Sequence, residues 1–131
     1  MPGSRPIVYS PTVKLLLENL PPSLAPQREV LRQCLEAMDA ALPLRQVILF
    51  GSHARGEAGP DSDVDLCLVA DGAERQLEAA RKFREAIWDF WPRPSLTLVP
   101  ITPARLREKD SVRDFFFGTV RKEGVLLASE N

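Results

Sequence analysis

The most constraining feature of this sequence is a polar segment, residues 51–62, that separates two short apolar segments. The first apolar segment, 46–50, is rich in branched and aromatic residues, a composition typical of a buried strand. The second, 63–69, begins with two aspartates in alternation with apolar residues and continues apolar to its end. Asp71-Gly72 then marks a turn. We therefore expect two buried strands joined by a glycine-containing connection.

The remaining pattern predicts helices around these strands. Apolar residues recur at three- and four-residue spacings along 26–42 and 73–91, as they do on one face of a helix. Segment 95–101 predicts a third strand, and Pro100 within it favours an edge position or a bulge. Three strands with helices before, between and after them predict a small α/β (α+β) domain. The other expected elements are a short helix at 13–20, helical turns at 103–109 and 110–121, and a packed turn or short strand at 124–127.

The distribution of proline suggests a boundary near residue 25. Six of the twelve prolines lie within residues 1–26. We therefore predict that residues 1–25 are a proline-rich N-terminal extension, loose over residues 1–10, and that residues 26–131 form a single domain.

Composition excludes several classes of protein. The formal net charge of −1 argues against a broad electrostatic surface for nucleic acid. Two cysteines, Cys34 and Cys67, are too few for a disulfide framework, and we expect both in the core. The sequence has neither a long apolar window nor an apolar signal segment at its N-terminus. We expect a cytoplasmic protein without membrane contact.

The spacing of Asp63 and Asp65 suits a metal ion. Two residues apart on a strand, both side chains project from the same face, with Cα atoms about 6.5 Å apart. Mg²⁺ prefers oxygen ligands and is commonly held by one or two carboxylates together with substrate phosphates. Taken alone, the pair fits two solvated acids at the mouth of a strand better than a metal site.

Gly51-Ser52, at the end of the preceding strand, suits a phosphate group. Glycine lets a phosphate approach the backbone closely, and Ser52 offers a hydroxyl and an N–H. Alone, this dipeptide also fits a plain turn capped by serine. Together with Asp63 and Asp65, however, it predicts a site for a nucleoside triphosphate with Mg²⁺ or Mn²⁺ on neighbouring strands.

These segments resemble the signature of the DNA polymerase β-like nucleotidyltransferases, and more narrowly their minimal nucleotidyltransferase (MNT) domains. The resemblance rests on Gly51-Ser52-His53-Ala54-Arg55-Gly56, on Ser62-Asp63-Val64-Asp65-Leu66 and, more loosely, on the terminal Arg121-Lys122-Glu123-Gly124-Val125-Leu126-Leu127. It implies a short mixed sheet with flanking helices and the transfer of a nucleoside monophosphate, most simply AMP from ATP.

The resemblance also implies a role for each motif residue. Asp63 and Asp65 would be catalytic and would bind the metal, whereas Gly51 and Ser52 would hold the triphosphate. Two further nucleotide contacts would come from Ser62 and from Arg55. For Arg55, a salt bridge that shapes the loop is an equal alternative.

One departure from the family pattern concerns the third carboxylate. Active members carry an acid on the strand beside the Asp-x-Asp strand, about five residues before a Thr-Pro, where it accepts the proton of the acceptor. Counting back from Thr102-Pro103 reaches Thr97, which cannot act as a carboxylate base. Three explanations remain open: another acid such as Asp89 or Asp110 reaches the site, a partner supplies the base, or the chain is catalytically weak or inactive.

Two functions follow from these alternatives. The first is an enzyme that modifies a partner protein, possibly as the antitoxin of a toxin–antitoxin pair with a helical HEPN-domain protein, a pairing that only the resemblance implies. The second is a protein-binding module on an inactive nucleotidyltransferase fold. Two smaller expectations are that His53 faces solvent rather than phosphate, and that aromatic residues near the surface contact a partner or pack locally. These aromatic residues are Trp88, Trp91 and Phe115-Phe116-Phe117.

Overall fold

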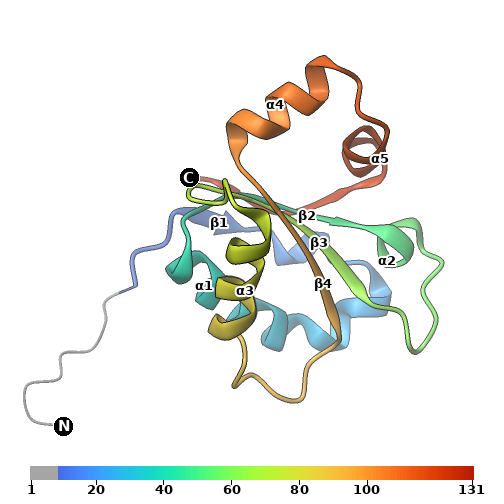
Figure 1. Cartoon of the computed structure of the whole chain (residues 1–131). Helices are drawn as coiled ribbons and strands as arrows, with labels where there is room; N and C mark the ends of the chain where they lie inside the picture. Colours follow the sequence, from blue (N-terminus) through green and yellow to red (C-terminus); the bar gives the residue numbers. More distant parts are fainter. Residues whose placement is uncertain (1–8) are drawn as a thin grey trace, which may run out of the picture.

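A computed structural model of the chain describes residues 9–131 (Figure 1). Within them lies a mixed five-stranded sheet of order β1-β5-β2-β3-β4, which confirms the expected mixture of a short sheet and flanking helices. The expectation that residues 1–10 are loose lies mostly outside the described residues. The strands are β1 (Val13–Leu15), β2 (Leu44–Phe50), β3 (Val64–Ala70), β4 (Leu96–Ile101) and β5 (Val125–Glu130). The helices are η1 (Leu17–Asn19), η2 (Pro22–Gln27), α1 (Arg28–Ala41), α2 (Gly51–Arg55), α3 (Gln76–Ala86), α4 (Pro103–Ser111) and α5 (Phe115–Glu123).

Strand pairing brings the start of β3 next to the end of β2. β2 lies between β3 and β5 and is antiparallel to both, so Phe50 at its end pairs with Asp65 near the start of β3. β3 and β4 are parallel, which requires a crossover connection, and α3 supplies it. The polar segment 51–62 therefore lies at one end of the sheet, where the starts of β3 and β4 also meet.

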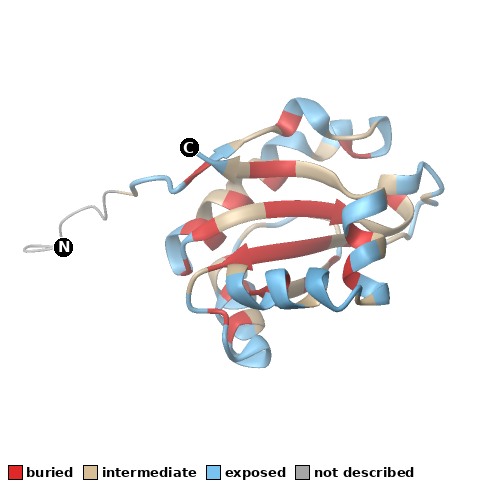
Figure 2. Cartoon of the chain, turned by 90° about the horizontal axis from the view of Figure 1, so that it is seen from above, coloured by how far each residue is buried: buried red, intermediate tan, exposed pale blue. Residues whose placement is uncertain are grey.

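Helices cover both faces of the sheet, and each face buries its own apolar cluster. α1 and α3 lie on one face and α4 and α5 on the other (Figure 1). The larger cluster, under α1 and α3, includes Leu49, Leu66 and Phe83. The smaller one, under α4 and α5, includes Ile48 and Cys67. The buried residues follow the strands, whereas the outer faces of the helices are exposed (Figure 2).

Both cysteines lie in the core as predicted. Cys34 and Cys67 are free and fully buried, and burial raises the pKa of Cys67 to about 12. Neither thiol is therefore ionised at neutral pH or available as a nucleophile.

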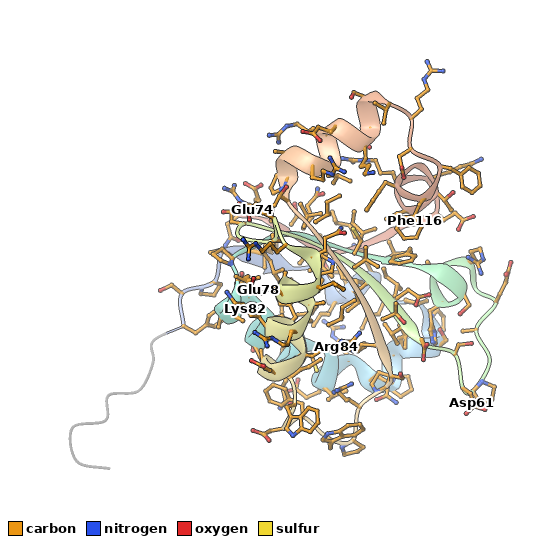
Figure 3. All side chains as sticks on the ribbon, viewed as in Figure 1. Asp61, Glu74, Glu78, Lys82, Arg84 and Phe116 are labelled. Carbon is orange, nitrogen blue, oxygen red and sulfur yellow. The ribbon has the colours of Figure 1, made fainter. Side chains whose placement is uncertain are left out.

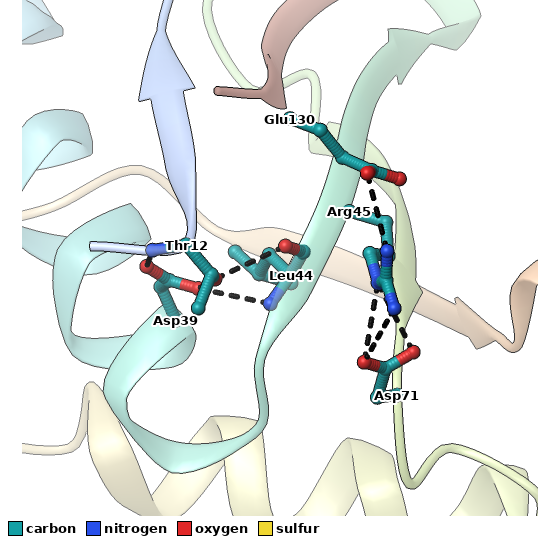
Figure 4. A network of polar contacts seen from close by, with 6 residues as sticks. All are labelled: Thr12, Asp39, Leu44, Arg45, Asp71 and Glu130. Carbon is teal, nitrogen blue, oxygen red and sulfur yellow. Dashed lines mark hydrogen bonds and ion pairs between the residues drawn. The ribbon is translucent and has the colours of Figure 1, made fainter. Parts of the chain in front are cut away.

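A buried carboxylate joins the N-terminal segment to the sheet. Asp39 of α1 is 4% exposed and accepts hydrogen bonds from the Tyr9 hydroxyl at 2.5 Å and the backbone N–H groups of Thr12 and Leu44 at 3.0 and 2.9 Å. The Thr12 hydroxyl also contacts this carboxylate and the Leu44 carbonyl (Figure 4). Arg45, next to Leu44 at the start of β2, forms ion pairs with Asp71, which follows β3, and with Glu130 of β5 (Figure 4).

Three elements differ from the prediction. Residues 13–20 are not a helix, because Val13–Leu15 pair with β5 as an edge strand and a 3-10 turn follows. The helix expected over 73–91 is shorter, Gln76–Ala86, because an irregular segment with two prolines follows it. Residues 125–130 form a full strand between β1 and β2. Consequently, residues 9–25, which we expected to be an extension, contribute a strand and core side chains such as Leu24.

Candidate functional site

The connection between β2 and α2 depends on Gly51. Its φ of +76° is a conformation that side chains with a Cβ rarely adopt. A Cβ built on Gly51 would lie 2.0 Å from Oδ2 of Asp65, far inside van der Waals contact. The absence of a side chain thus lets the Asp65 carboxylate lie directly against the backbone at the start of α2. The two halves of the motif meet at this contact, whose residues are fourteen positions apart in sequence.

The two aspartates are placed differently. Asp63 is exposed and precedes β3, whereas Asp65 is the second residue of the strand and is half-buried. Burial raises the pKa of Asp65 above its ordinary value; hydrogen bonding by the Thr97 side chain lowers it, and the charge of Asp63 raises it. Two carboxylates of like charge at this spacing favour a cation between them.

Thr97 lies beside Asp65. In the parallel register of β3 and β4, Asp65 pairs with Thr97, so the position that counting from Thr102-Pro103 indicates is indeed next to the carboxylates. The alternative acids lie elsewhere. Asp110 at the end of α4 forms an ion pair of 2.7 Å with Arg121, and Asp89 lies in the connection between α3 and β4, beside Pro26. The register thus supports Thr97, and not Asp89 or Asp110, as the residue beside Asp65.

Two residues that we predicted to contact phosphate have local roles in the segment 56–62. The Ser52 carbonyl accepts a hydrogen bond from the N–H of Glu57 at 2.9 Å. The side chain of Ser52 is half-buried at the start of α2. The Ser62 hydroxyl accepts the N–H of Gly59 at 2.9 Å and so closes the turn before Asp63. Neither contact uses the Ser52 hydroxyl.

His53 is buried, at 6% exposure, and the expectation of a solvent-facing side chain is wrong. Its Nδ1 lies 2.8 Å from the Ser23 hydroxyl, and its Nε2 lies 3.3 Å from the Ser62 carbonyl. A neutral ring with the proton on Nε2 satisfies both, since Nε2 then donates to the carbonyl and Nδ1 accepts from the hydroxyl. His53 thus connects η2, α2 and the segment before Asp63. Sequence gave no signal for this role, because Ser23 is thirty residues away.

Arg55 links α2 to α5. Its guanidinium pairs with Glu57 at 3.1 Å and with Glu123 of α5 at 3.5 Å. Both are exposed pairs, and such pairs contribute about 0–1 kcal/mol. The salt bridge that we weighed for Arg55 is present, and it is weak enough for a phosphate to compete for the guanidinium.

The donor set suits one divalent cation that also binds a substrate. Among residues 9–131, no three or more His, Cys, Asp or Glu side chains are grouped to hold a metal by themselves. Asp63 and Asp65 offer carboxylate oxygens only, the ligands that Mg²⁺ and Mn²⁺ accept, and a triphosphate would supply others. This pair fits a nucleotide-bound cation rather than a closed structural site.

The aromatic residues divide into exposed and packed groups. Trp88 and Trp91, in the connection before β4, are 72% and 69% exposed, whereas Phe117 of α5 is buried in the smaller cluster. Phe115 is almost fully exposed and Phe116 is partly exposed. Within the described part of the chain, no helix is long and apolar enough to cross a bilayer.

The family assignment of this chain rests on a match by sequence. A family model described as a nucleotidyltransferase domain matches residues 31–120. Over 59 residues, the chain is 37% identical to a candidate protein adenylyltransferase of Methanocaldococcus jannaschii, a match that covers 44% of this chain and 40% of that protein. The match therefore spans less than half the length of this curated relative. A crystal structure of a candidate nucleotidyltransferase from Sulfolobus solfataricus is similar with a TM-score of 0.44 and 25% identity, over 66% of this chain and 73% of the other.

Proposed function

Because the chain belongs to the nucleotidyltransferase domain family, we propose that it transfers a nucleoside monophosphate from a nucleoside triphosphate to a protein acceptor. AMP from ATP is the transfer we favour, since the relative from Methanocaldococcus jannaschii is named for adenylyl transfer to protein. The observation that carries the proposal is the contact between the two motif halves, where the Asp65 carboxylate lies against the backbone of Gly51.

In this proposal some residues of the motif bind the metal ion and the others bind the phosphates. Asp63 and Asp65 hold a Mg²⁺ or Mn²⁺ ion, which would neutralise charge on the triphosphate as the α-phosphorus is attacked. Ser52, at the start of α2, directs its hydroxyl and N–H at the phosphates. Arg55 and Ser62 add outer contacts, for which Arg55 exchanges its weak carboxylate pairs for phosphate oxygens.

In this scheme, the protein that receives the nucleoside monophosphate must itself supply the general base. Thr97 occupies the place beside Asp65 and has no basic group. We therefore propose a protein acceptor that contributes its own acid or histidine when it docks beside β3 and β4. A helical HEPN-domain protein, with this chain as its antitoxin in the cytoplasm, is the partner that the sequence resemblance favours.

The first test is calorimetric titration of the purified protein with ATP, with and without Mg²⁺. We expect binding that requires the metal and that the double substitution Asp63→Asn/Asp65→Asn abolishes. The substituted protein should remain folded by circular dichroism, because asparagine keeps the size of both side chains. Absence of ATP binding by the unsubstituted protein would refute the proposal.

A second candidate function is that of a protein-binding module without catalysis. The neutral side chain of Thr97 in the register position of Asp65 favours it. The test is to compare partner capture by the protein and by the Asp63→Asn/Asp65→Asn variant. Equal capture together with no nucleotidyl transfer to the captured partner supports this function over the enzyme.

A further inference from the structure

An aromatic side chain lies on the same face of the sheet as the Asp65 carboxylate. Phe50, the last residue of β2, pairs with Asp65 across the antiparallel ladder, and directly paired residues project from the same face. Phe50 packs against the smaller cluster, so this is the face that α4 and α5 cover. The site therefore borders an apolar region on the side of β2.

Phe116 of α5 extends toward this region. It extends from α5 toward the sheet (Figure 3), and its ring lies 5.6 Å from that of Phe50 at an angle of 88°. On its other side, the ring of Phe117 lies 5.0 Å away at 86°. These two edge-to-face contacts fix the orientation of the Phe116 ring. Nevertheless 43% of the residue stays exposed, so a fixed aromatic surface is open to a ligand beside the site.

We propose that the ring of Phe116 stacks on the base of the bound nucleotide. The inference rests on the proposed function and adds to it a base-binding residue. Paired Cα atoms in an antiparallel ladder are about 5 Å apart. Phe50 thus adjoins both Asp65 and the ring of Phe116, so a nucleotide whose phosphates lie at Asp65 can extend along the end of β2 toward Phe116.

The chemistry of the Phe116 ring also predicts that it does not discriminate between nucleotide bases. Phenylalanine has no hydrogen-bonding group, and stacking accepts every base because each has a π face. Phe116 should therefore strengthen the binding of ATP and GTP alike. Preference for one base would have to come from another residue or from the partner.

Phe115 provides a matched control on the same helix. It precedes Phe116 directly but is 90% exposed. It lines a shallow depression with Lys109 and Arg113, between α4 and α5 and away from Phe50. A substitution there removes an aromatic ring of equal size from α5 without touching the region beside Asp65.

The experiment compares the affinities of ATP and of inorganic tripolyphosphate, both with Mg²⁺, for Phe116→Leu, Phe116→Tyr and Phe115→Leu. Leucine keeps an apolar side chain against Phe50 and Phe117, and tyrosine keeps the ring. We expect Phe116→Leu to weaken ATP at least about fivefold, as loss of base stacking does, and to leave tripolyphosphate unchanged. Phe116→Tyr and Phe115→Leu should bind both ligands as the unsubstituted protein does.

Each contrary result has its own meaning. If Phe116→Leu binds ATP as tightly as the unsubstituted protein, the base-stacking role is wrong while the proposed function stands. If it weakens tripolyphosphate as much as ATP, the residue supports the fold of the site rather than the base, and the inference is equally wrong. If the unsubstituted protein binds neither ligand, the proposed function fails and the inference fails with it.

Discussion

The substitution Gly51→Ala tests how closely the two motif halves depend on one another. A non-glycine residue at a left-handed φ costs about 1–2 kcal/mol. In addition, the new methyl group would lie 2.0 Å from the Asp65 carboxylate, which must therefore move. Overpacking of this kind typically costs about 1–3 kcal/mol. We expect a loss of about 2–5 kcal/mol in the free energy of unfolding and loss of metal-dependent ATP binding.

Gly56→Ala is the matched control for this prediction. Gly56 has a nearly identical φ of +73°, and a Cβ there would meet nothing within 4 Å. Gly56→Ala should therefore lose only the stability that the left-handed backbone conformation costs. Both variants also gain stability from a less flexible unfolded chain, and this gain cancels in their difference. Gly51→Ala should thus be the less stable variant by about 1–3 kcal/mol.

The assay combines urea unfolding of both variants with calorimetric titration of ATP and Mg²⁺. Gly56→Ala should keep most of the nucleotide affinity, whereas Gly51→Ala should lose it because the carboxylate is displaced. Equal stability of the two variants, together with equal ATP binding, would show that the contact between Gly51 and Asp65 has no energetic weight and would refute the reasoning.

Three further predictions follow from the same structure. Burial, and to a lesser extent the charge of Asp63, raise the pKa of Asp65 in the folded protein. Ionised Asp65 therefore destabilises the metal-free protein at pH values above this raised pKa, and the effect disappears at pH values below the ordinary pKa of a carboxyl group. Asp65→Asn should therefore raise the melting temperature at pH 7, with a difference that shrinks in acid; a difference independent of pH would contradict this. Thr97→Asp should destabilise the metal-free protein relative to Thr97→Asn, and Mn²⁺ should restore its stability. If the base is the only group that is missing, Thr97→Asp should also increase pyrophosphate release from ATP by up to about 10²–10⁴-fold. An unchanged rate would mean that the defect lies elsewhere. Asp39→Ala, which leaves the Leu44 N–H unpaired, should cost about 2–3 kcal/mol in urea unfolding without changing ATP affinity, and a neutral effect would contradict the role of that network.

The central strands could be predicted because their own residues determine them. Segments 44–50 and 64–70 are apolar enough to be buried on both faces, and their composition alone indicates strands. Residues 13–15 could not be assigned, because three residues form a strand only through their pairing with β5, more than a hundred residues later. For the same reason, the burial of His53 depends on Ser23, which no local pattern connects to it.

The candidate site shows the same division. Gly51, Asp63 and Asp65 could be predicted because the motif is short and each of its halves adjoins a predicted strand. Thr97 could be found by counting from Thr102-Pro103, and the register of β4 places it beside Asp65. Phe116 could not be predicted as a neighbour of the site, because α5 reaches it only by folding over the sheet and packing on Phe50.

The pairing of β1 with β5 determines how this domain can be joined to other polypeptides. Val13 pairs with Glu130, so the start of β1 and the end of β5 lie side by side, next to the start of β2 (Figure 1). Gly51 lies at the other end of β2, five residues or about 16 Å along the strand from Gln46, which pairs with Ser129 of β5. A tag, linker or further domain attached directly after β5 therefore starts on the side opposite Asp63 and Asp65. An affinity handle or fluorescent fusion joined after β5 would leave the end of the sheet that carries Asp63 and Asp65 unobstructed.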